Sequence, residues 1–199
     1  MRYDLDLVAS WIDAGSRVLD LGCGQGELLN YLHATKGVRG VGVEQDEAKA
    51  CQAIAAGVSV LQGDMVREIR DFPDGKFDFV VLSQTLQQVQ EPVELLGQML
   101  RVGRRGIVSF PNFAHWRNRC QIFFQGRAPV TPELPYEWYD TPNIRVITIR
   151  DFTRFCNRHG IAVRQGVAVK TDPVSRTGLV LNWLPNLRAN YGIFLLERA

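Results

Sequence analysis

The chain has 199 residues, of which 46% are apolar and 22% are charged, and its 23 basic side chains nearly balance 21 acidic ones. This length and composition predict one globular domain with a sizeable core, and they exclude disordered, collagen-like and disulfide-scaffold proteins. The four cysteines, Cys23, Cys51, Cys120 and Cys156, are too widely spaced for a zinc or CxxC site. No stretch has the roughly 20 apolar residues of a membrane span, and the acidic start is unlike a signal peptide. We therefore expect a reduced, cytoplasmic protein without a metal site.

The net charge of +2 is the sum of two unlike halves. Residues 1–100 carry 8 basic and 15 acidic side chains, whereas residues 101–199 carry 15 basic and 6 acidic ones. Nineteen of the 23 cations are arginine, which suits carboxylates and phosphates and is enriched at protein interfaces. The basic half therefore indicates either an anionic ligand or acidic partner, or an ordinary arginine-rich surface.

Through the first 110 residues, short apolar runs alternate with segments of helical period. The predicted strands are residues 17–21, 38–43, 58–61, 77–82 and 106–110, and the predicted helices are residues 27–34, 46–55 and 92–100. Pro92 stands in the first turn of the last of these helices, where its missing N–H costs nothing. This order predicts right-handed βαβ crossovers and a parallel sheet that is covered by helices on both faces.

The pattern changes after Phe110, because five of the nine prolines fall within residues 111–142, among several aromatic residues. Long irregular segments of compact domains are usually lids or binding loops. We therefore predict one domain over residues 1–199, with a cap or partner-binding insertion at about residues 111–149. Within and after it we expect helices at 114–125 and 151–158 and strands at 161–169 and 191–196. The first of these helices has Trp116, Cys120, Phe123 and Phe124 on roughly one side.

A glycine-rich turn, Asp20-Leu21-Gly22-Cys23-Gly24-Gln25-Gly26, ends the first strand and opens a helix. Open α/β sheets bind ligands at this edge. The glycines allow a tight turn and a close approach of the backbone, with helix N–H groups facing the ligand. Glu44 ends the second predicted strand, where its carboxylate can accept hydrogen bonds from two ribose hydroxyls. The sequence therefore predicts a ligand that contains a nucleoside.

The glycine spacing argues against a dinucleotide. A GxGxxG fingerprint would need a small third residue, but Glu27 and Leu29 occupy the two positions that could supply it. The spacing instead resembles that of class I S-adenosylmethionine-dependent methyltransferases, in which a further acid follows the third strand, as Asp64 does here. This resemblance implies a Rossmann-like fold with a seven-stranded, mostly parallel sheet of order 3-2-1-4-5-7-6, its last strand antiparallel. It also implies S-adenosylmethionine or S-adenosylhomocysteine as the cofactor, bound by Asp20, Gly22, Gly24, Gly26, Glu44, Gln45, Asp64, Met65 and Ser83. The alternative is the same scaffold with an emptied pocket.

The sequence assigns no catalytic residue. Methyl transfer depends mostly on alignment, so a base is optional. Gln87 and Gln88 stand where many small-molecule methyltransferases of this fold have a histidine, and an amide cannot take a proton. The motifs that name planar amines (Asn-Pro-Pro-Tyr) or cytosine C5 (Pro-Cys) as substrates are absent. In an active methyltransferase, the candidate substrate contacts would be His115, Tyr136 and Tyr139.

Each of these candidates has a structural alternative. His115 is either a packed histidine or a catalytic one. Trp138 and Tyr139 can wall a pocket, form a hot spot for a partner, or simply fill the core. Cys23, inside the glycine turn, is expected to be a packing residue rather than a nucleophile.

Four stretches resemble the MetW family of methionine biosynthesis proteins: residues 82–87 (LSQTLQ), 101–117 (RVGRRGIVSFPNFAHWR), 134–143 (LPYEWYDTPN) and 148–152 (TIRDF). The resemblance covers nearly the whole chain, and one departure is Gln25, where an acid would be common. It implies a role in bacterial methionine biosynthesis beside the homoserine O-acyltransferase MetX, as a bound partner that this enzyme needs for full activity.

We therefore favour a protein that binds S-adenosylmethionine or S-adenosylhomocysteine and activates MetX. The alternative is an active methyltransferase that acts on a small molecule. A nucleic-acid methyltransferase is suggested only by the basic half, whose cations are scattered, so we expect neither nucleic acid nor a membrane as a partner. Neutralising Arg117 or Arg119 is expected to weaken the protein complex and to leave cofactor affinity nearly unchanged.

Overall fold

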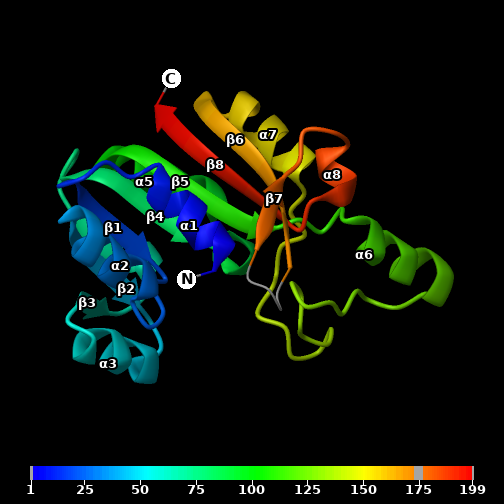
Figure 1. Ribbon diagram of the computed structural model, residues 1–199, viewed down its shortest axis with the longest axis horizontal. Coiled ribbons are helices and arrows are strands. Elements are labelled where there is room, and N and C mark those ends of the chain that lie inside the picture. Colours follow the sequence, from blue (N-terminus) through cyan, green and yellow to red (C-terminus); the bar gives the residue numbers. More distant parts are fainter. Residues whose placement is uncertain (1, 173–176, 199) are drawn as a thin grey trace.

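The computed structural model describes residues 2–172 and 177–198 (Figure 1). In the N-terminal part the elements are α1 (Tyr3–Ser10), β1 (Arg17–Leu21), α2 (Glu27–Lys36), β2 (Arg39–Glu44), α3 (Glu47–Ala55), β3 (Ser59–Gln62), α4 (Met65–Glu68), η1 (Ile69–Asp71), β4 (Phe77–Ser83), η2 (Leu86–Gln88), α5 (Pro92–Val102) and β5 (Gly103–Pro111). The strands and helices predicted here are confirmed, and no boundary is more than three residues off. The short elements α1, α4, η1 and η2 were not predicted.

The C-terminal part contains fewer helices and the antiparallel strands. Its elements are α6 (Trp116–Cys120), the π-helix η3 (Gln121–Gln125), α7 (Ile149–Arg158), β6 (Ile161–Thr171), β7 (Gly178–Val180), α8 (Pro185–Arg188) and β8 (Tyr191–Arg198). The predicted helix at 151–158 and the strands at 161–169 and 191–196 are confirmed.

One sheet of eight strands, in the order β3-β2-β1-β4-β5-β8-β6-β7, forms the framework. Strands β1 to β5 pair in parallel, and β8 runs antiparallel to both β5 and β6. The class I methyltransferase fold is therefore present, but the predicted count of seven strands is one too few. The extra strand, β7, pairs with the end of β6 at the sheet edge. Three residues are too short to show the alternation by which a strand is recognised in a sequence.

Two apolar layers cover the two faces of this sheet. Successive residues of a strand point to opposite faces, so Val18 packs in one layer and Leu19 in the other. The first layer is completed by side chains of α1, α2 and α3, and the second by side chains of α5 and α7. The prediction of helices on both faces is thus confirmed.

Helix starts follow local chemistry. The side chains of Asp46, Asp64 and Thr148 each accept a hydrogen bond from a backbone N–H in the first turn of α3, α4 and α7, at 2.9–3.1 Å. Pro92 occupies the first turn of α5, as predicted. These caps fix where each helix begins relative to the strand before it.

The segment predicted as one helix over residues 114–125 is a short α-helix that continues as a π-helix, α6 and η3, and its aromatic side is not buried. Phe123 and Phe124, which were predicted on one side of the helix, are 81% and 76% exposed. Periodicity identifies one apolar side of a helix but not what covers it. Figure 1 shows this segment projecting away from the sheet.

Candidate functional site

The carboxyl ends of the parallel strands open into a cleft of about 1210 Å³. Helix α1, the end of β6 and the chain from Pro132 to Asn143 form its other walls. Eight of the predicted cofactor residues line this cleft, namely Asp20, Gly22, Gly24, Glu44, Gln45, Asp64, Met65 and Ser83. The ninth, Gly26, is not among the lining residues. Topology brings these residues together, since the ends of neighbouring parallel strands meet at one edge.

The glycine turn follows a backbone path that only glycine adopts easily. Gly22, Gly24 and Gly26 have φ of 73°, 56° and 76°, in the left-handed region. A Cβ on Gly22 would lie 2.9 Å from Thr85 Oγ1, whereas a Cβ on Gly24 would meet nothing within 4 Å. Gly24 is therefore open toward the cleft. A Cβ on Gly26 would lie 2.9 Å from Val58 Cγ2, so Gly26 serves close packing beneath the turn.

Glu44 fastens the turn to the end of β2. Its Oε2 accepts a hydrogen bond from the Gly24 N–H at 2.8 Å, and its Oε1 accepts one from the Asp46 N–H at 2.9 Å. The N–H groups of Gly22 and Cys23 both donate to the carbonyl oxygen of Val43, at 2.8 and 3.1 Å. Each carboxylate oxygen retains a further lone pair, so Glu44 can accept two more hydrogen bonds from a ligand.

The floor of the cleft is strongly acidic. Asp20 is 3% exposed, and its burial, together with the charge of Glu44, raises its pKa from 3.8 to about 7. Burial, then the charges of Asp20 and Glu44, raises the pKa of the Cys23 thiol to about 12. Cys23 is therefore a neutral thiol rather than a nucleophile. Two carboxyl groups this close favour a cationic ligand group beside them.

The next two strand ends carry the other predicted residues. Asp64 Oδ1 accepts a hydrogen bond from the Val66 N–H at 2.9 Å, and Met65 packs partly against the core. The Ser83 hydroxyl lies 3.1 Å from Ser109 Oγ on the neighbouring strand. Asp64 and Ser83 thus each have a protein partner and also face the cleft.

Sequence reasoning missed the part of the cleft that α1 supplies. Asp4 is buried on α1, and its Oδ2 accepts hydrogen bonds from Gln84 Nε2 at 2.5 Å and from an Arg2 guanidinium nitrogen at 3.1 Å. Gln84 has a left-handed φ of 53°, which is unusual for a residue other than glycine. The two residues are 80 positions apart, so no local pattern signals their contact.

Of the three candidate substrate contacts, only Tyr136 lines the cleft. His115 is buried, its Nδ1 accepts a hydrogen bond from the Arg117 N–H at 3.4 Å, and burial lowers its pKa. Tyr139 is exposed and stands edge-on to Trp138 with ring centroids 5.7 Å apart. Because Trp138 is exposed as well, core filling is excluded for this pair.

Gln87 is buried in the cleft wall. Its Nε2 donates to the carbonyl oxygen of Gln84 at 2.7 Å, and its Oε1 has no hydrogen-bond partner among the described residues. Buried oxygens without partners are rare. The loop after β4 therefore presents a neutral acceptor rather than a base.

The sequence profile described as "Methionine biosynthesis protein MetW" matches residues 2–196. This chain belongs to the MetW family. The bifunctional methionine biosynthesis protein MetXA/MetW of Rhodopirellula baltica is 36% identical to it over 207 residues, an alignment that covers 100% of this chain and 33% of that protein. The MetW-family chain thus spans about one third of the length of this relative. A ubiquinone biosynthesis O-methyltransferase of Pseudomonas fluorescens is 31% identical over 85% of this chain and 77% of that protein.

Solved structures show the same fold at low identity. A SAM-dependent methyltransferase from Thermotoga maritima superposes with a TM-score of 0.72 at 18% identity, over 98% of this chain and 88% of that one. One from Mesorhizobium loti gives a TM-score of 0.68 at 18% identity, over 98% and 100% of the two chains. Magnesium protoporphyrin IX methyltransferase from Synechocystis PCC 6803, solved with bound SAM, gives 0.62 at 15% identity, over 98% and 78%. The MetW-family chain therefore has the fold of SAM-dependent methyltransferases.

No helix in residues 2–172 and 177–198 is long and apolar enough to cross a membrane. Within those same ranges, no group of three or more His, Cys, Asp or Glu residues is arranged to hold a metal ion.

Proposed function

We propose that this MetW-family protein binds S-adenosylmethionine or S-adenosylhomocysteine in the cleft and is a partner and activator of a homoserine O-acyltransferase of the MetX kind. The observation that carries the cofactor assignment is the turn of left-handed glycines hydrogen-bonded to Glu44 at the carboxyl edge of the parallel strands. The partner assignment is supported by the relative whose name joins MetXA and MetW in one chain.

The cleft residues suit the two ends of such a cofactor. Glu44 is held by two backbone N–H groups, so its free lone pairs are aimed for ribose hydroxyls, with Gln45 beside it. We assign Asp64 and Met65 to the adenine and Asp20 to the ammonium of the amino-acid end. Gly22, Gly24 and Gly26 shape the turn, and Ser83 borders the pocket.

Bound S-adenosylmethionine supplies a methyl group on a positively charged sulfur. Gln87 and Gln88 cannot accept a proton, so the loop after β4 offers no general base to an acceptor. A cofactor site beside a loop that supplies no base is consistent with a binding and reporting role, although a base is optional in methyl transfer and its absence does not exclude that reaction.

The two parts of the proposal are connected through methionine supply. S-Adenosylmethionine is made from methionine, so a protein that binds both it and the acyltransferase can report methionine supply to that enzyme. This role requires a coupling free energy: the acyltransferase must change cofactor affinity by the same factor as the cofactor changes acyltransferase affinity.

The test uses the purified chain and the homoserine O-acyltransferase from the same genome. Calorimetry should give a Kd for each cofactor, and this Kd should change when the acyltransferase is added. Acyltransferase activity should be higher with the chain than without it. The proposal is wrong if acyltransferase activity is the same with and without the chain and the cofactor Kd is the same with and without the acyltransferase.

A second candidate function is methyl transfer to a small molecule. Tyr136 in the cleft wall favours it, and so does the volume of the cleft, which exceeds the roughly 300–1,000 Å³ of ordinary ligand pockets and leaves room for a second molecule. Incubation with labelled S-adenosylmethionine and a panel of methionine-pathway metabolites separates the two functions. Methylated product would favour this second one.

The proposal also takes the protein to act in the cytoplasm, without nucleic acid. Cys23 and Cys156 are buried free thiols, which suits a reducing compartment. The arginines are spread over many elements, and several are paired with acids of the chain itself, as in Arg17–Asp78 and Arg105–Asp13. A filter-binding titration at low salt should therefore show no specific affinity for DNA or RNA.

A further inference from the structure

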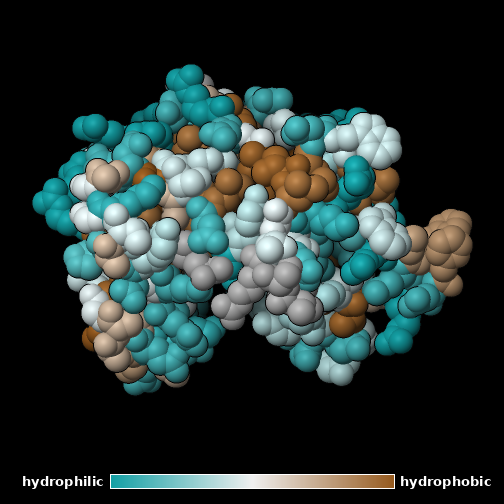
Figure 2. All heavy atoms as spheres, in the orientation of Figure 1, coloured by the Kyte–Doolittle hydropathy of each residue, from teal (hydrophilic) through white to brown (hydrophobic). Residues whose placement is uncertain are grey.

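Residues 116–130, which we call the arm, carry a cluster of exposed apolar side chains. The arm consists of α6, η3 and the chain that returns from Gly126 to Val130. Trp116, Ile122, Phe123 and Phe124 are all exposed on it. Figure 2 shows apolar residues at the far end of this projection, with hydrophilic surface between them and the main body. Scattered apolar side chains on a surface need no explanation, but a contiguous set with a polar rim marks an interaction site.

The two phenylalanines at the tip form a unit. Their rings meet edge-to-face with centroids 4.8 Å apart. Each buries roughly 150–250 Å² when it is covered, and aromatic anchors of this kind dominate the energetics of protein interfaces. The tip therefore offers a large apolar area that no other described residue covers.

Hydrogen bonds join the two sides of the arm. Gln121 Nε2 donates to the Val130 carbonyl at 3.1 Å, and the Val130 N–H donates to Gln121 Oε1 at 2.8 Å. Gly126, with a left-handed φ of 62°, turns the chain between them. A π-helix such as η3 is rare and occurs frequently at functional sites. A fixed surface loses little conformational entropy on binding, which favours affinity.

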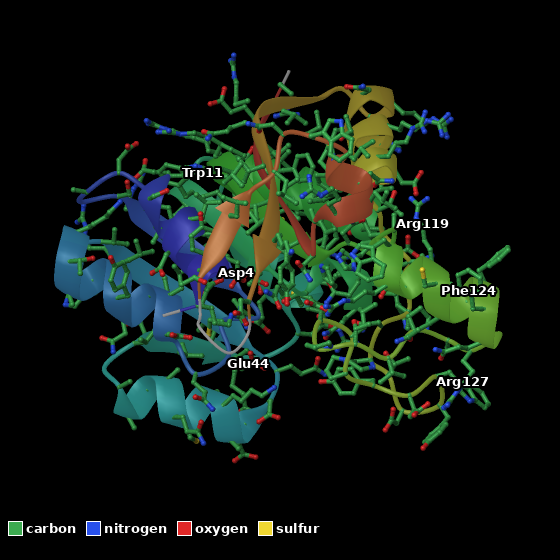
Figure 3. The ribbon with its side chains drawn as sticks, turned by 45° about the vertical axis from the view of Figure 1, so that its right-hand side comes forward. Asp4, Trp11, Glu44, Arg119, Phe124 and Arg127 are labelled. Atoms are coloured by element: carbon green, nitrogen blue, oxygen red, sulfur yellow. The ribbon has the colours of Figure 1, made fainter. Side chains whose placement is uncertain are left out.

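The charged residues of the arm are all basic. Residues 113–132 contain Arg117, Arg119 and Arg127 and no Asp or Glu. Arg119 Nε donates to the Ala114 carbonyl at 2.7 Å, so it fastens the base of the arm. The Arg117 guanidinium lies over the Trp116 ring, 5.6 Å from its centroid, and Arg127 is 4.0 Å from Glu137 and largely exposed. Figure 3 shows Arg119 at the base of the arm and Phe124 and Arg127 toward its end, away from Asp4 and Glu44.

We propose that the arm is the docking surface for the acyltransferase partner. On that enzyme, Phe123 and Phe124 would bind in an apolar pocket that is surrounded by acidic residues. This inference rests on the proposed function. The alignment with the fused relative covers the whole of this chain and therefore includes the arm. Aromatic anchors flanked by arginine are the side chains that carry most binding energy at protein interfaces. The arm suits a membrane surface less well than a protein partner. A helix that lies in a membrane interface needs a long apolar face and many cations, whereas α6 and η3 have five residues each.

The experiment compares two sets of exposed apolar side chains in the full-length protein. The test variant is Phe123→Ala/Phe124→Ala, and the control is Leu179→Ala/Trp183→Ala, which removes two exposed apolar side chains outside the arm. The Kd for the homoserine O-acyltransferase should rise by about 100-fold or more in the test variant and by less than about threefold in the control. The Kd for S-adenosylhomocysteine should stay within about twofold in both, which shows that each variant is folded.

Charge gives an independent readout. Arg117→Gln/Arg127→Gln should weaken the complex and reduce the dependence of its Kd on salt, because charges at a rim act through screened attraction. A wild-type complex that the Phe123→Ala/Phe124→Ala variant leaves unchanged overturns the arm assignment while the partnership stands. Loss of the complex in the control variant alone also overturns it. Absence of any wild-type complex overturns both proposals. Arm-dependent binding to phosphatidylglycerol vesicles, with acyltransferase affinity unchanged, assigns the arm to a membrane instead.

Discussion

Gly26 and Gly37, at the two ends of α2, separate two effects of an alanine substitution on stability. Both positions have a left-handed backbone, but only at Gly26 would an added Cβ also clash with neighbouring side chains. Gly26 and Gly37 flank this helix, and both are left-handed, with φ of 76° and 62°. A Cβ at position 26 would lie 2.9 Å from Val58 Cγ2 and 3.1 Å from Ala53 Cβ, whereas a Cβ at position 37 would meet nothing within 4 Å. Each alanine substitution carries the left-handed penalty of roughly 1–2 kcal/mol. Only Gly26→Ala adds overpacking, which costs about 1–3 kcal/mol.

Gly26→Ala should therefore be less stable than Gly37→Ala by about 1–3 kcal/mol. Urea unfolding followed by tryptophan fluorescence measures both free energies, and thermal unfolding gives a second value at about 2–4 °C for each kcal/mol. Cofactor affinity of the folded Gly26→Ala protein should fall less than that of a Gly22→Ala protein, because Gly22 lines the cleft and Gly26 does not. Equal unfolding free energies in the two variants would refute the reasoning that Gly26 is required for close packing.

Three further predictions concern the acidic side chains of the cleft. Glu44→Gln keeps an acceptor for the Gly24 N–H but loses the charge and one acceptor facing the ribose, so calorimetry should show a cofactor Kd about 10- to 100-fold higher. Burial raises the pKa of Asp20 from 3.8 to about 7 in the folded protein. Between these two pH values the folded protein binds more protons than the unfolded chain, so the free energy of unfolding should fall as pH rises from about 4 to 7. Asp20→Asn should remove that slope in urea titrations at several pH values, and wild-type cofactor binding should tighten from pH 6 to pH 8. Asp4→Ala leaves Gln84 Nε2 without its acceptor, so unfolding free energy should fall by about 1–3 kcal/mol and hydrogen exchange in α1 should quicken.

Each of these has an outcome that contradicts it. A Glu44→Gln protein with wild-type affinity would mean that the ribose lies elsewhere. A pH slope that persists in Asp20→Asn would assign the titration to another group. Unchanged exchange in α1 would show that the contact between Asp4 and Gln84 does not hold this helix.

The sequence predicted the parallel half of the fold well because each of those strands is a short apolar run bounded by polar turns. The strand from Arg17 to Leu21 has both faces covered, which produces the continuous run. Glu44 was predicted from its place at the end of a parallel strand, and the resemblance to class I methyltransferases added Asp64 at the end of the next strand. Neither inference needs any knowledge of distant contacts.

The errors have physical causes as well. The helix from Tyr3 to Ser10 is held by tertiary packing and by the long-range contact of Asp4 with Gln84, which no local pattern contains. The sequence placed Phe123 and Phe124 on one side of a helix but could not show that this side faces solvent. Hydrophobic periodicity shows which residues share a side of a helix, and it does not show whether the rest of the chain covers that side.

The return of the arm leads directly into the wall of the cleft. Val130 is hydrogen-bonded to Gln121, Thr131 and Leu134 form a small β-bridge, and Pro132 and Glu133 already line the cleft. A single residue, Thr131, therefore separates the proposed docking surface from the cleft proposed to bind the cofactor. A connection this short has little slack to absorb a displacement. We therefore expect a shift of the cleft wall on ligand entry to displace the arm, and an insertion after Thr131 should reduce this coupling.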